Sequence, residues 1–179
     1  MNLHKIITKN GDQGETNLVY RNAKKSEPII ECIGTIDEAN ASIGMARHSL
    51  RHRLNDLDKD LDKLLDQVQN HLFDLSADLI CDTNKINTFY IDLIEDAAND
   101  INKRLLPLNS FVLPKGEEAV LHLARTIVRR AERRFWRYYE LIESTNTDPG
   151  IYLNRLSDLL FIICRAVHSG EEEVWQRLK

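Results

Sequence analysis

Apolar side chains recur every three or four residues over most of the chain after residue 28. The first stripe begins beyond Pro28, a residue suited to the first turn of a helix. Its members are Cys32, Ile36, Ala39, Ile43, Ala46 and Leu50. This spacing places one face of a helix against a core. The pattern therefore predicts a helix from residue 28 to about residue 50.

Four more stripes follow the first one. Their spacing predicts helices over about 54–81, 89–106, 117–142 and from 149 to the end of the chain. A connector at 107–116 separates the third and fourth of these. Long helices joined by short links are typical of an up-and-down bundle. We therefore expect an all-α fold, a five-helix up-and-down bundle.

The first 27 residues differ from the rest because they show no helical period. They are polar and contain Gly11 and Gly14 among Asn, Asp and Thr residues. The stretch predicts an extended N-terminal arm. The whole length of 179 residues fits one domain. We expect a single domain over 1–179, with an arm at 1–27 and the bundle at 28–179.

Composition narrows the class of protein. The formal net charge is −4, which argues against a nucleic-acid coat, and no apolar run approaches the ~20 residues of a membrane span. The three cysteines are Cys32, Cys81 and Cys164, which are far apart and are interpreted as reduced core residues. No apolar run of signal-peptide length stands at the start. We expect no membrane and no nucleic-acid partner, and a cytoplasmic location.

The predicted fourth helix carries an unusual concentration of arginine. Between Arg125 and Arg137 there are six arginines and one acid, a local charge of +5. The side opposite its apolar stripe holds His122, Arg125, Arg129, Glu132, Arg133 and Trp136. A solvated face is one interpretation, but such faces usually mix lysine and acids. Arginine binds phosphate or carboxylate with two prongs, so a polyphosphate ligand or an acidic partner surface is indicated.

Polar residues on two other predicted helices are aligned in a similar way. Asn154 and Asp158 are one turn apart, so both could address one ligand or hold neighbouring arginines. Ser157, Phe161 and Arg165 share their side. The alternative to ligand binding is that these polar residues only cap the helix or face solvent. Asp37, on the first helix, is a natural mate for an arginine on another helix or subunit.

The arm has a weak phosphate-binding pattern, and the chain has no obvious nucleophile. Gly11 and Gly14 flank an acid, with threonines at both ends of segment 8–16, so amide N–H groups could turn onto a phosphate. The lysine–serine ending of a Walker loop is missing. No serine, cysteine or histidine stands among partners that would activate it, and neither a Glu-x-x-His motif nor a zinc spacing occurs. His48 and His52 are four residues apart, as metal ligands can be, but they stand among arginines and are better interpreted as a solvated face. In an enzyme, something other than a side chain would attack.

Five motifs taken together resemble one family, the PduO-type ATP:corrinoid adenosyltransferases. They occur in the family's order and span nearly the whole chain: TKNGDQGET at 8–16, GTIDEAN at 34–40, FVLP at 111–114, RRAERR at 129–134 and YLNRLSD at 152–158. The resemblance implies a five-helix homotrimer that binds ATP and cobalamin between neighbouring subunits. It also implies transfer of the 5′-deoxyadenosyl group of ATP to Co(I), with release of triphosphate. Because Co(I) is itself a strong nucleophile, no activated side chain is required.

The resemblance also assigns roles to residues. It implies that the arm wraps the phosphates, with Lys25 adding charge; the arm residues are Thr8, Lys9, Gly11, Asp12, Gly14 and Thr16. It makes Arg129 and Arg133 the polyphosphate contacts, and Glu132 and Asn154 complete the nucleotide site. Mg²⁺ is expected to arrive with the triphosphate rather than in a protein cage.

Two further roles concern the corrinoid and the subunit interface. The resemblance implies that Asp37 orients Arg129 from across the interface, and that Phe111 presses on the lower face of the corrinoid and displaces its axial base. Losing that ligand makes Co(II) easier to reduce. The chain departs from the family at Lys115, where glycine is common, and at Ile29, where arginine is common.

The family also implies partners, and other interpretations remain open. A corrinoid reductase or an adenosylcobalamin-dependent enzyme is a possible partner. A helical bundle without catalysis could instead dock an acidic partner through its arginines, and a protein of the same fold could carry or sense cobalamin. The arm together with Phe111 favours the enzyme over the docking protein, because a docking surface requires neither.

Overall fold

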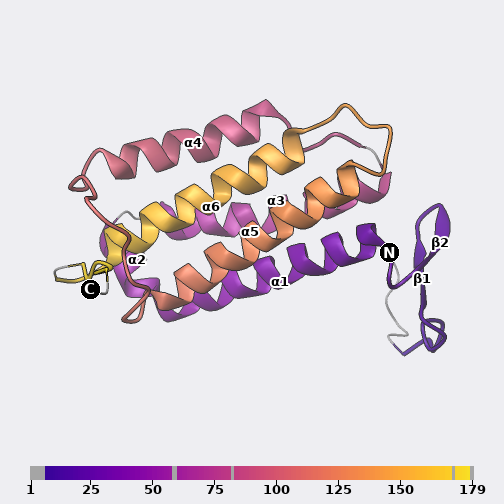
Figure 1. Cartoon of the computed structure of the whole chain (residues 1–179), viewed down its shortest axis with the longest axis horizontal. Coiled ribbons are helices and arrows are strands. Elements are labelled where there is room, and N and C mark those ends of the chain that lie inside the picture. The colour runs from indigo at the N-terminus through magenta and orange to yellow at the C-terminus, as the bar shows by residue number, and fades with distance from the viewer. Residues whose placement is uncertain (1–6, 58–59, 82, 171, 178–179) are drawn as a thin grey trace.

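The computed structural model describes residues 7–57, 60–81, 83–170 and 172–177. These residues form a hairpin of two strands and six helices: β1 (Glu15–Leu18), β2 (Arg21–Lys24), α1 (Pro28–Ser49), α2 (Arg51–Leu57), α3 (Leu61–Cys81), α4 (Thr88–Asn102), α5 (Ala119–Tyr139) and α6 (Asp148–Val167). The long helices lie side by side along the longest axis, with the hairpin at one end and the C-terminal segment at the other (Figure 1). The expected all-α bundle is confirmed.

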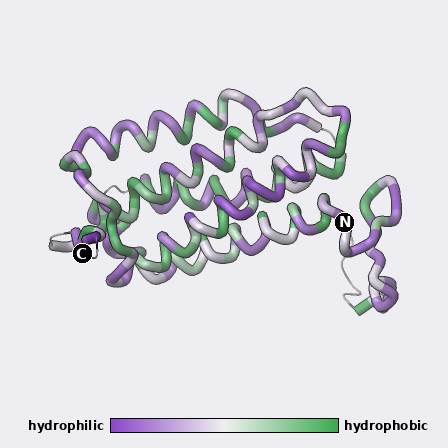
Figure 2. Tube along the Cα trace, in the orientation of Figure 1, coloured by the Kyte–Doolittle hydropathy of each residue, from purple (hydrophilic) through white to green (hydrophobic). Residues whose placement is uncertain are grey.

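The core lies where the apolar stripes meet. α1 packs against α3 and α5, α5 packs against α6, and α6 packs against α4. Apolar and polar positions alternate along each of these helices (Figure 2). Tyr152 and Phe135 are the largest of the fully buried side chains. Among the described residues, no helix is long and apolar enough to cross a membrane.

Several predicted helix boundaries are wrong. The stretch predicted as one helix over 54–81 consists of α2 and α3, and Asp60 accepts a hydrogen bond from the Leu64 amide at the start of α3 (2.8 Å). Aspartate is a favoured residue just before a helix, so it marks a new start inside the apolar pattern. The third helix ends at Asn102, and the fourth covers only Ala119–Tyr139. The last helix ends at Val167, before Gly170 with its φ of +106°.

The arm contains a β-hairpin that the sequence pattern did not indicate. Thr16 pairs with Ala23 and Leu18 with Arg21 in antiparallel register. Leu18 and Ala23 are buried together with Ile29, the second residue of α1. Partly buried side chains of Ile30, Ile33, Ile80 and Tyr138 surround them. This small apolar cluster fixes the arm to the Pro28 end of the bundle.

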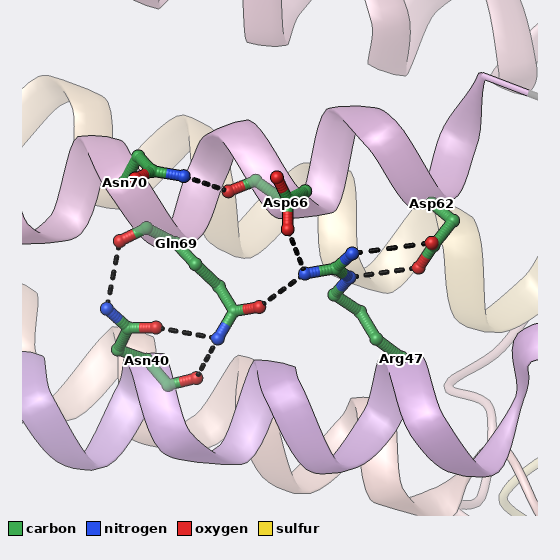
Figure 3. A network of polar contacts seen from close by, with 6 residues as sticks. All are labelled: Asn40, Arg47, Asp62, Asp66, Gln69 and Asn70. Atoms are coloured by element: carbon green, nitrogen blue, oxygen red, sulfur yellow. Dashed lines mark hydrogen bonds and ion pairs between the residues drawn. The ribbon is translucent and has the colours of Figure 1, made fainter.

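The α1–α3 interface is joined by a polar network centred on Arg47 (Figure 3). The guanidinium donates to Asp62 from Nε (2.9 Å) and to both Asp66 and Gln69 from Nη1 (2.7 Å each). Gln69 in turn donates to the side-chain oxygen of Asn40 (2.8 Å), and Asn40 donates to the Gln69 carbonyl (2.9 Å). Every group of this network has a partner within the chain, so the network fixes α1 against α3.

The cysteines are all free thiols, but they are not equally buried. Cys32 and Cys164 lie in the core, as predicted. Burial raises the pKa of each of these thiols to about 12. The prediction is wrong for Cys81, which is half-buried because it is the last residue of α3.

Candidate functional site

The arginines of α5 divide into two rows with different partners. Arg134 pairs with Glu31 of α1 (2.5 Å), and Arg130 pairs with Glu38 of the same helix. Arg129 and Arg133 are exposed and form no ion pair within the described parts of the chain. The first row binds α5 to α1. The second row, which we call the open row, leaves its charge for something outside the chain.

Polar side chains of α6 stand next to the open row. The Asn154 amide nitrogen donates to Glu132 Oε1 across the α5–α6 interface (3.2 Å). Asp158 follows one turn later. Burial raises the pKa of Asp158, and the positive charges of Arg155 and Arg129 oppose that rise. The structure therefore brings together Glu132 and Asn154, as the sequence predicted, and it adds Asp158 beside Arg129.

A cavity of about 590 Å³ connects the open row with the loop before α5. Arg125, Arg129 and Asp158 contribute its polar lining; the other lining residues are Leu108, Asn109, Ser110, Phe111, Val112, Ser157 and Phe161. Phe111 is 79% exposed, so its ring is free to contact a ligand. The Arg125 guanidinium lies 5.7 Å from the centre of the Phe161 ring. An apolar surface with arginines at its edge suits two ligands in contact, one large and partly apolar and the other anionic.

The C-terminal segment holds the Phe111 loop in place. The Trp175 amide donates to the Phe111 carbonyl (2.7 Å), and the Leu113 amide donates to the Glu173 carbonyl (2.8 Å). Lys115 forms an ion pair with Glu173. Lys115, the departure from the family pattern, thus fastens this loop to the C-terminal segment. Sequence reasoning missed the segment because it predicted helix there.

The arm brings Lys25 onto its glycine segment. Lys25 Nζ donates to the Gly11 carbonyl (2.8 Å), and the Lys25 amide donates to the Gly14 carbonyl (2.8 Å). Gly14 has a φ of +82°, which favours glycine. A Cβ atom on Gly11 would lie 2.8 Å from Lys25 Nζ, so glycine at this position leaves room for the lysine in its present place. Thr8, Lys9 and Asp12 are exposed, and Thr16 is half-buried.

The arm and the cavity stand apart within one chain. The hairpin lies at the Pro28 end of the bundle, and the segment between α4 and α5 lies at the other (Figure 1). α5, which runs between these ends, has 21 residues and is therefore about 30 Å long. Among the described arm residues, 7–27, none lines the cavity that holds Phe111 and Arg129. Asp37 is exposed on α1 and makes no ion pair with any described residue, so the expected contact with Arg129 is not made within one chain.

Two residues predicted on polar helix faces are buried instead. His122 is 4% exposed and Ser157 is 2% exposed. His122 lies near the start of α5 and lines a cavity of about 280 Å³ together with Glu118, Cys164 and His168. Burial lowers the pKa of His122, and the charge of Arg125 lowers it further. The helical pattern could not indicate this, because the cover comes from the C-terminal part of the chain.

Comparison with known proteins gives consistent matches. The family model described as cobalamin adenosyltransferase matches residues 6–167. A corrinoid adenosyltransferase of Mycobacterium leprae is 36% identical over 191 residues, covering 98% of this chain and 97% of that protein. One from Bacillus subtilis is 36% identical over 173 residues, covering 92% and 87%.

Solved structures match as well. A phenylalanine-to-alanine variant of the PduO-type ATP:corrinoid adenosyltransferase from Lactobacillus reuteri, complexed with cobalamin and ATP, has a TM-score of 0.82 and 29% identity. The match covers 97% of this chain and 100% of that one. A phenylalanine-to-histidine variant with the same ligands has a TM-score of 0.77 and 31% identity, covering 90% of each chain.

Proposed function

The chain belongs to the cobalamin adenosyltransferase family, and on that premise we propose that it transfers the 5′-deoxyadenosyl group of ATP to reduced cobalamin or a related corrinoid. The products are adenosylcobalamin and triphosphate. One observation carries the proposal: the 590 Å³ cavity places the exposed Phe111 ring beside Arg129, a member of the open row. A corrinoid and a polyphosphate would meet there.

The reaction requires positioning and charge rather than an activated side chain. The Co(I) of the substrate attacks the 5′ carbon of ATP; a cobalt–carbon bond forms, and the carbon–oxygen bond to the triphosphate breaks. The bonding electron pair leaves with the triphosphate, whose charge therefore grows along the reaction. Arg129 and Arg133 would stabilise that charge more strongly in the transition state than in the ground state. Their lack of ion-pair partners in the described residues supports this role.

Phe111 supplies the corrinoid side of the site. A ring that is 79% exposed and is held by its backbone to Trp175 is free to press on the lower face of a corrinoid. Displacing the axial base would make the bound Co(II) easier to reduce. Mg²⁺ would accompany the triphosphate, and Glu132 with Asn154 would bind the rest of the nucleotide.

The active site would be completed by a second subunit. The hairpin of the arm lies at one end of the bundle, and the segment between α4 and α5, which carries Phe111 of the cavity, lies at the other. Asp37 is exposed on α1, so the arm and Asp37 are both available to a neighbour. We propose a homotrimer in which Asp37 of one subunit orients Arg129 of the next and the arm wraps the phosphates. Each subunit would be a single domain over residues 1–179, acting in the cytoplasm and receiving reduced corrinoid from a reductase.

The test is an anaerobic incubation with ATP, Mg²⁺ and chemically reduced cobalamin. We expect the corrinoid spectrum to change to that of a light-sensitive alkyl cobalamin, with one triphosphate released for each molecule formed. A carrier or sensor of the same fold would bind the ligands without releasing triphosphate. A rate no higher than that of the protein-free control would contradict the proposed activity.

A further inference from the structure

A line of polar contacts crosses three helices and ends at Glu132 of α5. Arg155 of α6 donates from Nε to Glu95 of α4 and from Nη1 to the side-chain oxygen of Asn154 (2.9 Å). Asn154 then donates from its amide nitrogen to Glu132 Oε1 of α5 (3.2 Å). All four side chains are half-buried. The line therefore connects α4, which carries no predicted site residue, with the proposed nucleotide site.

The two neighbours of Asn154 allow its amide only one orientation. A guanidinium can only donate hydrogen bonds, so only the carbonyl oxygen of Asn154 can face Arg155. An ionised carboxylate can only accept them, so only the amide nitrogen can face Glu132. If the amide were rotated by 180°, its nitrogen would face the donors of Arg155 and its oxygen would face the acceptors of Glu132. Asn154 thus keeps its nitrogen toward Glu132, with one hydrogen donated to that carboxylate and a second available to another acceptor.

Glu95 determines where Arg155 lies. The pKa of Arg155 is raised chiefly by the hydrogen bond to Glu95 and less by the charge of Asp158. Asp158 is three residues along α6 and so lies on a neighbouring part of the helix surface. Without Glu95, Asp158 would be the competing carboxylate for Arg155, and a guanidinium drawn to it would leave the Asn154 oxygen. Glu95 therefore keeps Arg155 beside Asn154.

We propose that Glu95 and Arg155 are positioning residues that fix the Asn154 amide so that its free N–H meets an acceptor atom of ATP. This inference rests on the proposed function, because it assumes that Asn154 contacts the nucleotide. Glu95 and Arg155 act only through Asn154 and do not touch the ligand. Because they act through Asn154, substitutions of Glu95 or Arg155 should have no effect on ATP binding once the Asn154 side chain is removed.

The experiment is a double-mutant cycle on the full chain, with the Kd of MgATP measured by titration calorimetry in the absence of corrinoid. Glu95→Ala, Arg155→Ala and Asn154→Ala should each weaken binding by about tenfold, the loss typical of one hydrogen bond to a charged group. Glu95→Gln keeps an acceptor for Arg155 and should restore most of the affinity. The double variant Glu95→Ala/Asn154→Ala should bind ATP as Asn154→Ala alone does.

A matched control lies on the same helix. Asp100→Ala removes the surface ion pair with Lys103 (2.8 Å) and should leave ATP affinity unchanged. Thermal unfolding of every variant shows whether weaker binding comes from loss of the fold or from a displaced Asn154 amide in a folded protein. Steady-state assays should show the KM for ATP rising in Glu95→Ala with a smaller change in kcat.

The outcomes separate this inference from the proposed function. Wild-type affinity in Glu95→Ala, or an additive loss in Glu95→Ala/Asn154→Ala, would overturn the positioning role and leave the proposed activity intact. Wild-type protein that binds no MgATP, or Asn154→Ala that binds it normally, would overturn the nucleotide site and the positioning role with it.

Discussion

Two regions of the molecule place arginine side chains in different surroundings. At the α1–α3 interface, the single guanidinium of Arg47 meets two carboxylates and an amide oxygen, all from the same chain. On α5, Arg129 and Arg133 meet no carboxylate as ion-pair partners among the residues the structure describes. The first arrangement holds helices together, and the second leaves two exposed guanidiniums available to a ligand or another subunit.

The difference teaches how to separate structural arginines from functional ones on the same helix. α5 carries both kinds, since Arg130 and Arg134 pair with Glu38 and Glu31 of α1. A count of charges along the helix treats all of them alike. Only the position of the partners shows which charges stabilise the fold. Substitutions of the two kinds of arginine should therefore affect stability and ligand binding differently.

The largest effect is expected from Arg133→Ala. Removing a charge that stabilises the leaving triphosphate should lower kcat by about 100- to 1000-fold. The melting temperature should stay close to that of the wild type, because no ion pair within the described residues is lost. Arg137→Ala, an exposed arginine one turn further along α5, is the control. An Arg133→Ala variant that unfolds, or one whose kcat is that of the wild type, would show that Arg133 is not a functional arginine.

Arg47→Ala should give the opposite pattern. It removes hydrogen bonds to Asp62, Asp66 and Gln69 and leaves Asp62 without its partner. We expect the free energy of unfolding to fall by about 2 kcal/mol, measured by urea denaturation. Below the melting temperature, the Kd for MgATP should not change. Weaker ATP binding in folded Arg47→Ala would contradict a purely structural role for Arg47.

Lys25 extends the comparison to the arm. Its ammonium donates to the Gly11 carbonyl rather than to a carboxylate, so its charge is also left for a ligand (2.8 Å). Lys25→Gln should weaken MgATP binding by about tenfold, as expected for the loss of one charged hydrogen bond. Stability should be unchanged in thermal unfolding. The neighbouring Lys24→Gln serves as control, and equal losses in both variants would indicate only a general effect of charge.

The smallest effect concerns the pH dependence of Asp158. Asp158 is exposed overall, but partial withdrawal of its carboxyl from water raises its pKa in the folded protein, so folding favours its protonated form. The ionised group therefore reduces stability at neutral pH, and this cost disappears as the pH falls below about 4, the ordinary pKa of aspartate. Asp158→Asn should raise the melting temperature at pH 7 and lose that advantage on acidification. Asp100→Asn should not raise it, because Lys103 lowers the pKa of Asp100.

The sequence predicted the elements that depend on local periodicity. The stripe through Ile36, Ile43 and Leu50 became the buried face of α1, and the arginines of α5 lie on the faces that their spacing indicated. A repeat of about 3.6 residues is visible in any one stretch of chain, which explains this success. That Glu132 and Asn154 share one site was expected from the family resemblance rather than from periodicity, and the two side chains are in contact.

The sequence did not predict features that depend on distant segments. The contact of Trp175 with Phe111 joins residues far apart in the chain, and nothing in either stretch indicates the other. His122 was missed for a similar reason, since Cys164 and His168, from a distant part of the chain, share its cavity. The hairpin was missed because its strands have four residues each, too few for an alternating pattern to stand out. The role of Asp37 depends on a second subunit and stays a prediction.

The most direct test of this account mixes two inactive proteins. One carries Lys25→Gln and Gly14→Val, which damage the arm, and the other carries Arg129→Ala and Arg133→Ala. The two are unfolded together, refolded in equal amounts and assayed for adenosylcobalamin formation. If each site takes its arm and its arginines from different subunits, random assembly restores about a quarter of the sites, and activity should return to about a quarter of the wild-type value. Activity no higher than the sum of the separate variants would contradict a site shared between subunits.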